Sequence, residues 1–532
     1  MRPHLLFADK DLGEPPESVA PLVADLVTDL ELETLLTAMA GDDPLVYDVC
    51  AQVVTATDTT PETVRYRQEM LADALAHTAE LRELYTIAGQ AMADERKIYR
   101  TTFEWRSEAT LRRAVRVLRR LLGAVAQLRE VTDSLQGQAH SAALREMCRT
   151  LSTELGDAYL QEARQRIDEL ELTHGLLVSA SLDQGDAVSG MRPKLANLSG
   201  NRLIGRRPRL SKPNFSYTIA DRDQAGMEAF SSFRDRSLTQ VAHAADTSAT
   251  HILTFLSCLR REVAFYLGCA RLHASLDDLG VPVCVPAVID TGVRALNATE
   301  LRDVPLALRT SSAPVPVTVK AADAPLIVVT GANRGGKSTA LRALGVAQLM
   351  AQAGMFVAAD AFEFAVCAGV FTHFKREEDA SMEHGKFDEE LDRMARIVEA
   401  ISPGCLLLAN ESFASTNEQE ASDVGFDVLT ALVDSGVTVV LVTHLFTLAQ
   451  QLYDDSRPSR FLRAERGADG RRPYQLEPAP PLRTSFGGDI YRAVFGVALD
   501  DHGLPAQGAS SDPPGRRRVV RSAPESASYQ TD

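Results

Sequence analysis

The feature that most constrains this chain is a glycine-rich turn between an apolar run and a helical pattern, in the stretch LIVVTGANRGGKSTAL from Leu326 to Leu341. The turn matches the phosphate-binding P-loop, G-x-x-x-x-G-K-S/T, at every required position. Its small residues let backbone N–H groups converge on a phosphate, Lys337 places a charge beside the β- and γ-phosphates, and Ser338 offers a hydroxyl to Mg²⁺. The stretch therefore predicts a nucleoside triphosphate site. Its predicted members are Gly331, Ala332, Asn333, Arg334, Gly335, Gly336, Lys337, Ser338 and Thr339.

Composition limits the classes of protein that fit. The formal net charge of −16 argues against a chain coated with basic residues, so any nucleic-acid contact must be a local patch or a channel. The seven cysteines form no CxxC pair and have no nearby histidine set, which predicts reduced thiols and neither a disulfide frame nor a zinc site. The sequence also shows no basic-then-apolar leader and no long apolar run. We therefore expect a cytoplasmic protein with no membrane partner.

Residues 1–310 are predicted to form a mostly α-helical core and lever region. Apolar residues alternate at spacings of four and three from Leu111 to Val125 and again from Ile252 to Tyr266, as in the seam of a coiled coil. Arginines occupy the other faces of the first segment, where they form either a solvated helix face or a nucleic-acid contact. These arginines are Arg112, Arg113, Arg116, Arg119 and Arg120.

Two further segments are basic. Arginines between Arg202 and Arg209 precede Phe215 and Tyr217, a combination that suits either a phosphate-tracking surface or a structured loop packed on the core. Residues 501–532 are rich in Gly, Pro, Ser and arginine and are predicted to be a disordered basic tail.

Residues 311–500 are predicted to be an α/β P-loop ATPase domain of the ABC-like type, because strand and helix patterns alternate from residue 326 onward. Strands are expected at 354–358, 365–374, 405–409 and 437–443. Ser415–Glu418 is expected to be a turn and N-cap before a helix that ends near Val433. Another helix is expected to begin within Ser381–Phe387.

Two strand ends carry candidate catalytic residues. The strand at 405–409 ends in Asn410 and Glu411, where P-loop ATPases normally carry Asp-Glu to support Mg²⁺ and to activate the attacking water. Glu411 is thus the candidate base, and an uncharged Asn410 predicts weaker Mg²⁺ dependence or slower turnover, with hydrolysis retained. His444 follows the strand at 437–443 and is a candidate contact for the γ-phosphate or the water.

The order of these motifs resembles the ATPase domain of the MutS family, the ABC-like ATPases of DNA mismatch repair. The family's P-loop pattern is matched from Gly331 to Thr339, including Asn333. The acidic strand end with its threonine-containing turn is matched by Glu411 and Thr416. The later Thr-His pair and the Thr-Ser-Phe-Gly sequence are matched at Thr443–His444 and Thr484–Gly487.

The resemblance departs from the mismatch-repair proteins in three places. Residues from 20 onward already resemble the family's core region. The chain therefore resembles a short form without the N-terminal mismatch-recognition domain and its Phe-x-Glu wedge. Gly385 and Lys386 stand where the family's signature has Ser-Thr, although Phe387 and Glu390 fit, and Asn410 replaces Asp.

The resemblance implies ATP and Mg²⁺ as cofactors and an ATP-clamped homodimer in which Ser381–Lys386 faces the partner's nucleotide. It assigns the loop and Lys337 to the phosphates, Ser338 and Asn410 to Mg²⁺, Glu411 to water activation and His444 to sensing of the γ-phosphate. The implied function is an ATP-dependent DNA-binding protein that hydrolyses ATP slowly, in mismatch repair or the handling of recombination intermediates. The alternative is a nucleotide-gated protein-interaction module with no direct DNA binding. A transporter-coupled ABC ATPase is disfavoured, because the chain lacks that family's Ser-Gly-Gly-Gln signature.

Overall fold

The computed structural model describes residues 2–13, 21–57, 59–98, 107–171, 178–182, 188–193, 222–290, 295–321, 324–376, 385–466 and 472–483. The predicted basic segment at 202–217, the predicted tail at 501–532 and Thr484–Gly487 lie outside these residues. So do the first four residues of the predicted signature, Ser381–His384.

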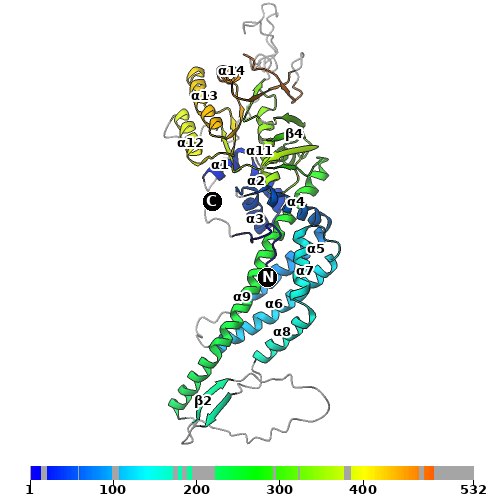
Figure 1. The fold of residues 1–532 in the computed structure, drawn as a ribbon, viewed down its shortest axis with the longest axis vertical. Coiled ribbons are helices and arrows are strands. Elements are labelled where there is room, and N and C mark those ends of the chain that lie inside the picture. The colour runs from blue at the N-terminus through cyan, green and yellow to red at the C-terminus, as the bar shows by residue number, and fades with distance from the viewer. Residues whose placement is uncertain are drawn as a thin grey trace, which may run out of the picture.

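The N-terminal part is helical, and an elongated arm extends from it (Figure 1). The arm's longest element is α9 (Gln224–Asp278), whose 55 residues span about 80 Å at 1.5 Å per residue. The antiparallel pair β1 (Val178–Leu182) and β2 (Val188–Pro193) lies near its far end (Figure 1). The other helices of this part are α1 (Pro21–Asp29), α2 (Leu32–Ala40), α3 (Pro44–Val54), α4 (Pro61–Ala76), α5 (Thr78–Lys97), α6 (Ser107–Leu135), α7 (Ala142–Glu154) and α8 (Asp157–Leu170).

The two helices predicted from four-three spacing are confirmed as α6 and α9, and they pack against each other. Arginines on the polar faces of α6 largely pair with acidic residues of the same chain. Arg113 contacts Glu95 and Asp246, Arg119 contacts Asp168 and Glu171, and Arg112 contacts Glu108. These pairs favour the interpretation as a solvated helix face, while Arg116 and Arg120 are exposed.

The predicted α/β fold is present as a six-stranded sheet in the order β12-β11-β6-β10-β9-β8. Its strands are parallel except β12, which pairs antiparallel with β11. The P-loop strand is thus flanked by the strand before His444 and by β11, and the strand before Glu411 is one position further away. The strands are β6 (Leu326–Gly331), β8 (Val370–Phe374), β9 (Leu406–Asn410), β10 (Thr438–Val442), β11 (Ser459–Ala464) and β12 (Leu476–Pro478).

A second, four-stranded sheet has the order β3-β7-β4-β5, with β3 (Ala287–Ile289), β4 (Leu296–Leu301), β5 (Val317–Lys320) and β7 (Ala361–Ala365). The predicted division between residues 310 and 311 runs through this sheet, because β4 lies before it and β5 after it. The predicted strand at 354–358 is wrong: only Val357 makes an isolated bridge, to Cys284. The run is apolar because Met355–Ala359 is buried as irregular chain.

The helix that follows the P-loop, α11 (Lys337–Gln352), is buried along most of its length and contacts β9, β10 and α3. One apolar core joins this face of the large sheet to the N-terminal helices and the small sheet. A second core lies on the other face, under α12 (Lys386–Ala400), α13 (Glu418–Asp434) and α14 (Phe446–Asp454). The remaining short helix is α10 (Val304–Thr310). None of the described helices is long and apolar enough to cross a membrane.

Candidate nucleotide site

The P-loop needs its glycines for close packing against β11. A Cβ atom added at Gly331 would lie 2.9 Å from the backbone N of Ala464. One added at Gly335 would lie 2.9 Å from the Cβ atom of Ala464. Gly331 and Gly336 also have positive φ angles of 109° and 86°, which side chains disfavour. The loop therefore keeps a bare backbone turn at the carboxyl end of β6, where a phosphate can approach closely.

Lys337 lies inside this turn and is only 5% exposed. Its Nζ atom donates to the carbonyl oxygens of Gly331 and Ala332, each at 3.1 Å. Burial lowers the pKa of the Lys337 ammonium group, although the nearby carboxylate of Glu411 opposes this shift. Among the described residues, two carbonyl oxygens hold this buried ammonium group and no carboxylate pairs with it directly. The phosphates of a nucleotide would supply a charged partner.

Ser338 and Asn410 meet at the other side of the loop, as the sequence predicts. The Ser338 hydroxyl donates to Asn410 Oδ1 at 3.0 Å, and Ser338 is exposed. Hydroxyl and amide oxygens are hard ligands of the kind that Mg²⁺ accepts beside phosphate oxygens and water. The two side chains therefore fit a Mg²⁺ ion that arrives with the nucleotide.

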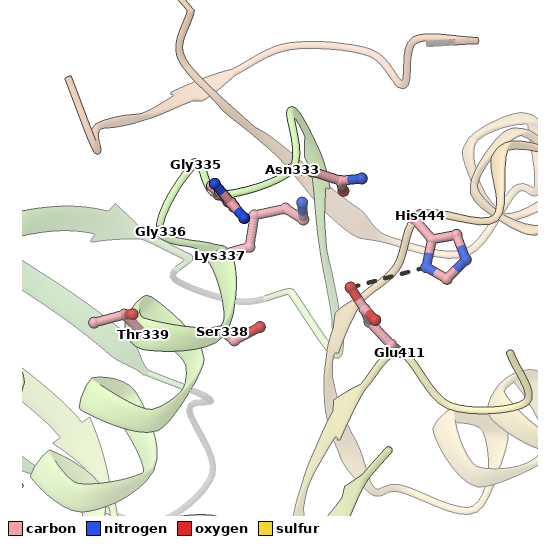
Figure 2. A pocket seen from close by; sticks show the side chains of 9 residues that line it. Asn333, Gly335, Gly336, Lys337, Ser338, Thr339, Glu411 and His444 are labelled. Atoms are coloured by element: carbon pink, nitrogen blue, oxygen red, sulfur yellow. Dashed lines mark ion pairs between the residues drawn. The ribbon is translucent and has the colours of Figure 1, made fainter. Parts of the chain in front are cut away.

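The two predicted catalytic side chains come from adjacent strand ends and face each other (Figure 2). Glu411 Oε1 lies 3.8 Å from His444 Nδ1, and both side chains are about one-third exposed, at 32% and 36%. The backbone N–H of Glu411 donates to Val442 O at 2.8 Å, which ties the end of β9 to β10. This bond fixes the backbone from which the Glu411 carboxylate projects toward the loop.

The structure brings most of the predicted site residues around one pocket of about 370 Å³. Gly331 and Ala332 do not line the pocket but hold Lys337 through their carbonyl groups, and Asn410 reaches the pocket through Ser338. The lining residues are Asn333, Arg334, Gly335, Gly336, Lys337, Ser338, Thr339, Glu411 and His444.

A second, more apolar pocket of about 360 Å³ shares Arg334, Gly336 and Thr339 with the first. Its other lining residues belong to no motif that marks a site in the sequence. Among them, Tyr474 is 46% exposed and Val315 52% exposed, and a Cβ atom at Gly336 would lie 3.3 Å from the Tyr474 ring. Isolated apolar residues in Pro-rich or loop segments give no sequence signal of this kind. The pocket has the size and lining for a flat ring beside the phosphates.

The predicted signature helix is present as α12, with Gly385 as its N-cap. Met394 and Ile397 of this helix are buried in the second core, and Phe387, Leu391 and Ile401 pack against it, whereas Val398 is 47% exposed. Glu390 accepts a hydrogen bond from Ser415 Oγ at 2.9 Å, so α12 is fixed against the turn before α13. The N-cap of α13 is Asn417, which accepts from Glu420 N at 3.0 Å, as predicted.

Comparison with known protein families gives two matches. Residues 59–279 match the MutS2 N-terminal domain, and residues 327–461 match MutS domain V. The first covers the helices from α4 through α9, and the second begins in β6 and ends in β11.

Individual relatives show the same similarity at modest identity. Endonuclease MutS2 of Lacticaseibacillus casei is 28% identical over 220 residues, which is 40% of this chain and 27% of that protein. Endonuclease MutS2 of Alkaliphilus metalliredigens is 32% identical over 125 residues, 23% of this chain and 16% of the relative. The mouse MutS protein homolog 4 is 28% identical over 123 residues, 23% of this chain and 13% of the relative. The matched part therefore spans about a quarter or less of each relative's length.

Proposed function

Because the chain belongs to the MutS family, we propose that it is an ATPase whose nucleotide state controls its binding to DNA. The observation that carries this proposal is the single pocket that contains Lys337, Glu411 and His444. The P-loop supplies the cation and the backbone donors for the phosphates, and Glu411 supplies the only carboxylate among the pocket's lining residues. Ser338, with Asn410 beside it, would hold Mg²⁺, and the ion would supply positive charge to offset the phosphates.

In this proposal Glu411 accepts a proton from the attacking water as the water oxygen bonds to the γ-phosphorus. The bond from that phosphorus to the bridging oxygen breaks, and ADP leaves with its electron pair. His444, 3.8 Å from Glu411, contacts the γ-phosphate or this water. Lys337 leaves the carbonyl groups of Gly331 and Ala332 and binds the β- and γ-phosphates. The adenine ring enters the second pocket, beside Tyr474 and Val315.

The DNA part of the proposal rests on family membership and on the long helical arm. Two copies would form a homodimer in which ATP is held between a P-loop and the partner's signature helix, and the arms would enclose DNA. We place the function in mismatch repair or in the handling of recombination intermediates. The word endonuclease stands in the names of the MutS2 relatives. The function proposed for this chain is confined to ATP hydrolysis and DNA binding.

The ATPase proposal is tested by steady-state hydrolysis with purified protein and Mg²⁺-ATP. We expect slow hydrolysis by the parent and loss of both nucleotide binding and hydrolysis in Lys337→Met. The matched control is Lys320→Met, which removes the same charge at an exposed position of β5 and should retain the parent activity. Hydrolysis by Lys337→Met at the parent rate would refute the assignment of the site.

The DNA proposal is tested by equilibrium binding of duplex, branched and single-stranded DNA across a salt series, with and without ATP. Phosphate contacts should make the affinity fall steeply as salt rises, and ATP should change the affinity of the parent but not of Lys337→Met. If no DNA form binds at low salt, the alternative of a nucleotide-gated protein-interaction module is favoured instead.

A further inference from the structure

A fully buried histidine bridges the loop that carries Glu411 and the signature helix α12. His373 lies in β8, directly opposite Ala409 of β9, and its side chain is 0% exposed. Its Nδ1 atom is 2.7 Å from Ser412 Oγ, and its Nε2 atom is 3.0 Å from the carbonyl oxygen of Glu390 in α12. The proposed mechanism uses neither His373 nor Ser412.

The protonation state of the ring follows from these contacts. A carbonyl oxygen only accepts, so Nε2 carries a proton and donates to Glu390 O. Burial, reinforced by the positive charge of Arg393, lowers the pKa of His373 to about 4, so the ring is neutral and Nδ1 is an acceptor. The Ser412 hydroxyl therefore donates to Nδ1, although the carbonyl oxygen of His373, at 2.9 Å, is also within its reach.

The loop that receives this bridge is conformationally strained. Glu411 and Phe413 have φ angles of 53° and 65°, in the left-handed region that side chains disfavour. Such residues persist where the surroundings hold them. Here the His373 ring stacks on Phe413, with ring centroids 5.8 Å apart, and binds Ser412 between the two strained residues.

The other end of the bridge is equally well anchored. Arg393 of α12 is 3% exposed, and its Nη1 atom donates to Phe374 O at 2.9 Å. Its guanidinium also lies within 3.5 Å of Asp29 and 3.8 Å of Asp25, both in α1. Helix α12 is therefore held beside β8, and the His373 ring joins this assembly to the strained loop.

We propose that His373 is a positioning residue for Glu411, which it holds in place through Ser412 by tying the loop after β9 to α12. The proposal rests on the ATPase function inferred above. It predicts that cutting the bridge displaces the Glu411 carboxylate and slows the chemical step, whereas the P-loop, which the bridge does not touch, still binds ATP.

The test compares kcat, KM for ATP and thermal stability in Ser412→Ala, His373→Gln and the double variant. Ser412→Ala removes the hydroxyl. His373→Gln keeps an N–H donor for Glu390 O but has no acceptor at the Nδ1 position that faces Ser412. Ser422→Ala is the matched control, because that hydroxyl is also 0% exposed in the same domain but donates within α13, to Glu418 O at 2.6 Å.

We expect kcat to fall about ten-fold in each bridge variant, with KM unchanged, because a displaced base loses only part of the roughly 10²–10⁴-fold that general base catalysis contributes. The double variant should be no slower than the slower single variant, because both remove one interaction. A purely structural role would lower the stability but leave kcat per folded molecule at the parent value, as in Ser422→Ala, and this result would overturn the proposal. If the parent hydrolyses ATP while Ser412→Ala keeps its rate, only the positioning role fails; a parent without hydrolysis overturns both inferences.

Discussion

Replacing Asn410 by Asp restores the charge that P-loop ATPases usually place beside their Mg²⁺ ion, and the structure allows the effect to be sized. Asn410 Oδ1 accepts a hydrogen bond from Ser338 Oγ at 3.0 Å, and a carboxylate oxygen accepts the same bond. Two unit charges about 4 Å apart interact by about 1 kcal/mol in bulk water, so a divalent cation gains about 2 kcal/mol from one added carboxylate. Screening by salt reduces this gain, and about 1.4 kcal/mol corresponds to a ten-fold change in affinity.

We therefore expect Asn410→Asp to lower the Mg²⁺ concentration that gives half-maximal hydrolysis by about ten-fold, or to raise kcat. The assay is steady-state hydrolysis at fixed ATP across a MgCl₂ series at constant ionic strength. Gln138→Glu adds the same charge at an exposed position after α6 and should leave both quantities at the parent values. If Asn410→Asp changes neither the Mg²⁺ requirement nor the rate, the role assigned to Asn410 is refuted.

Three further outcomes follow from the structure. Glu411→Gln should slow hydrolysis by about 100-fold or more while fluorescent ATP still binds, because the isosteric amide cannot accept the proton from water; full hydrolysis would remove Glu411 from the mechanism. Gly345→Ala should lower the free energy of unfolding by about 1–2 kcal/mol, since overpacking costs more than the helix gains: its Cβ atom would lie 2.5 Å from Leu408 Cδ1 and 2.9 Å from Leu30 Cδ2. Gly123→Ala in α6, which meets nothing within 4 Å, should not destabilise the protein in the same denaturant titration, and equal losses would contradict the packing argument. The pKa of His373 is about 4 in the folded protein and 6.5 ordinarily, so the unfolded chain binds more protons in this window. Stability should fall as the pH drops from 6.5 to 4, by up to about 1.4 kcal/mol per pH unit from this group, and His373→Gln should flatten this dependence.

The core of the site could be predicted because each of its parts is encoded in a short segment. The P-loop, the strand end at Asn410 and Glu411, and the strand end at His444 each follow a buried apolar run, and parallel strands bring such ends to one edge of a sheet. The long helices α6 and α9 could also be predicted, since the spacing of their apolar residues is regular over several turns.

The remaining features depend on contacts between distant segments. Tyr474 joins the P-loop only through the fold, and His373 and Ser412 are 39 residues apart. The run at 354–358 was predicted as a strand because burial and strand pairing produce the same apolar pattern, and here only burial applies. The arginines of α6 form ion pairs with acidic residues on α5, α8 and α9. The sequence of α6 alone does not identify these partners.

Because α9 is one continuous helix, a small tilt at one of its ends produces a large displacement of the other end. A helix of about 80 Å that tilts as a rigid rod by about 5° at its root moves its opposite end by about 7 Å. Its root packs against α2 and α3, and α3 contacts α11, the helix that begins with Lys337. One probe could be placed beside the P-loop and a second near residue 224. The distance between them would change measurably even when the rearrangement at the nucleotide itself is too small to detect.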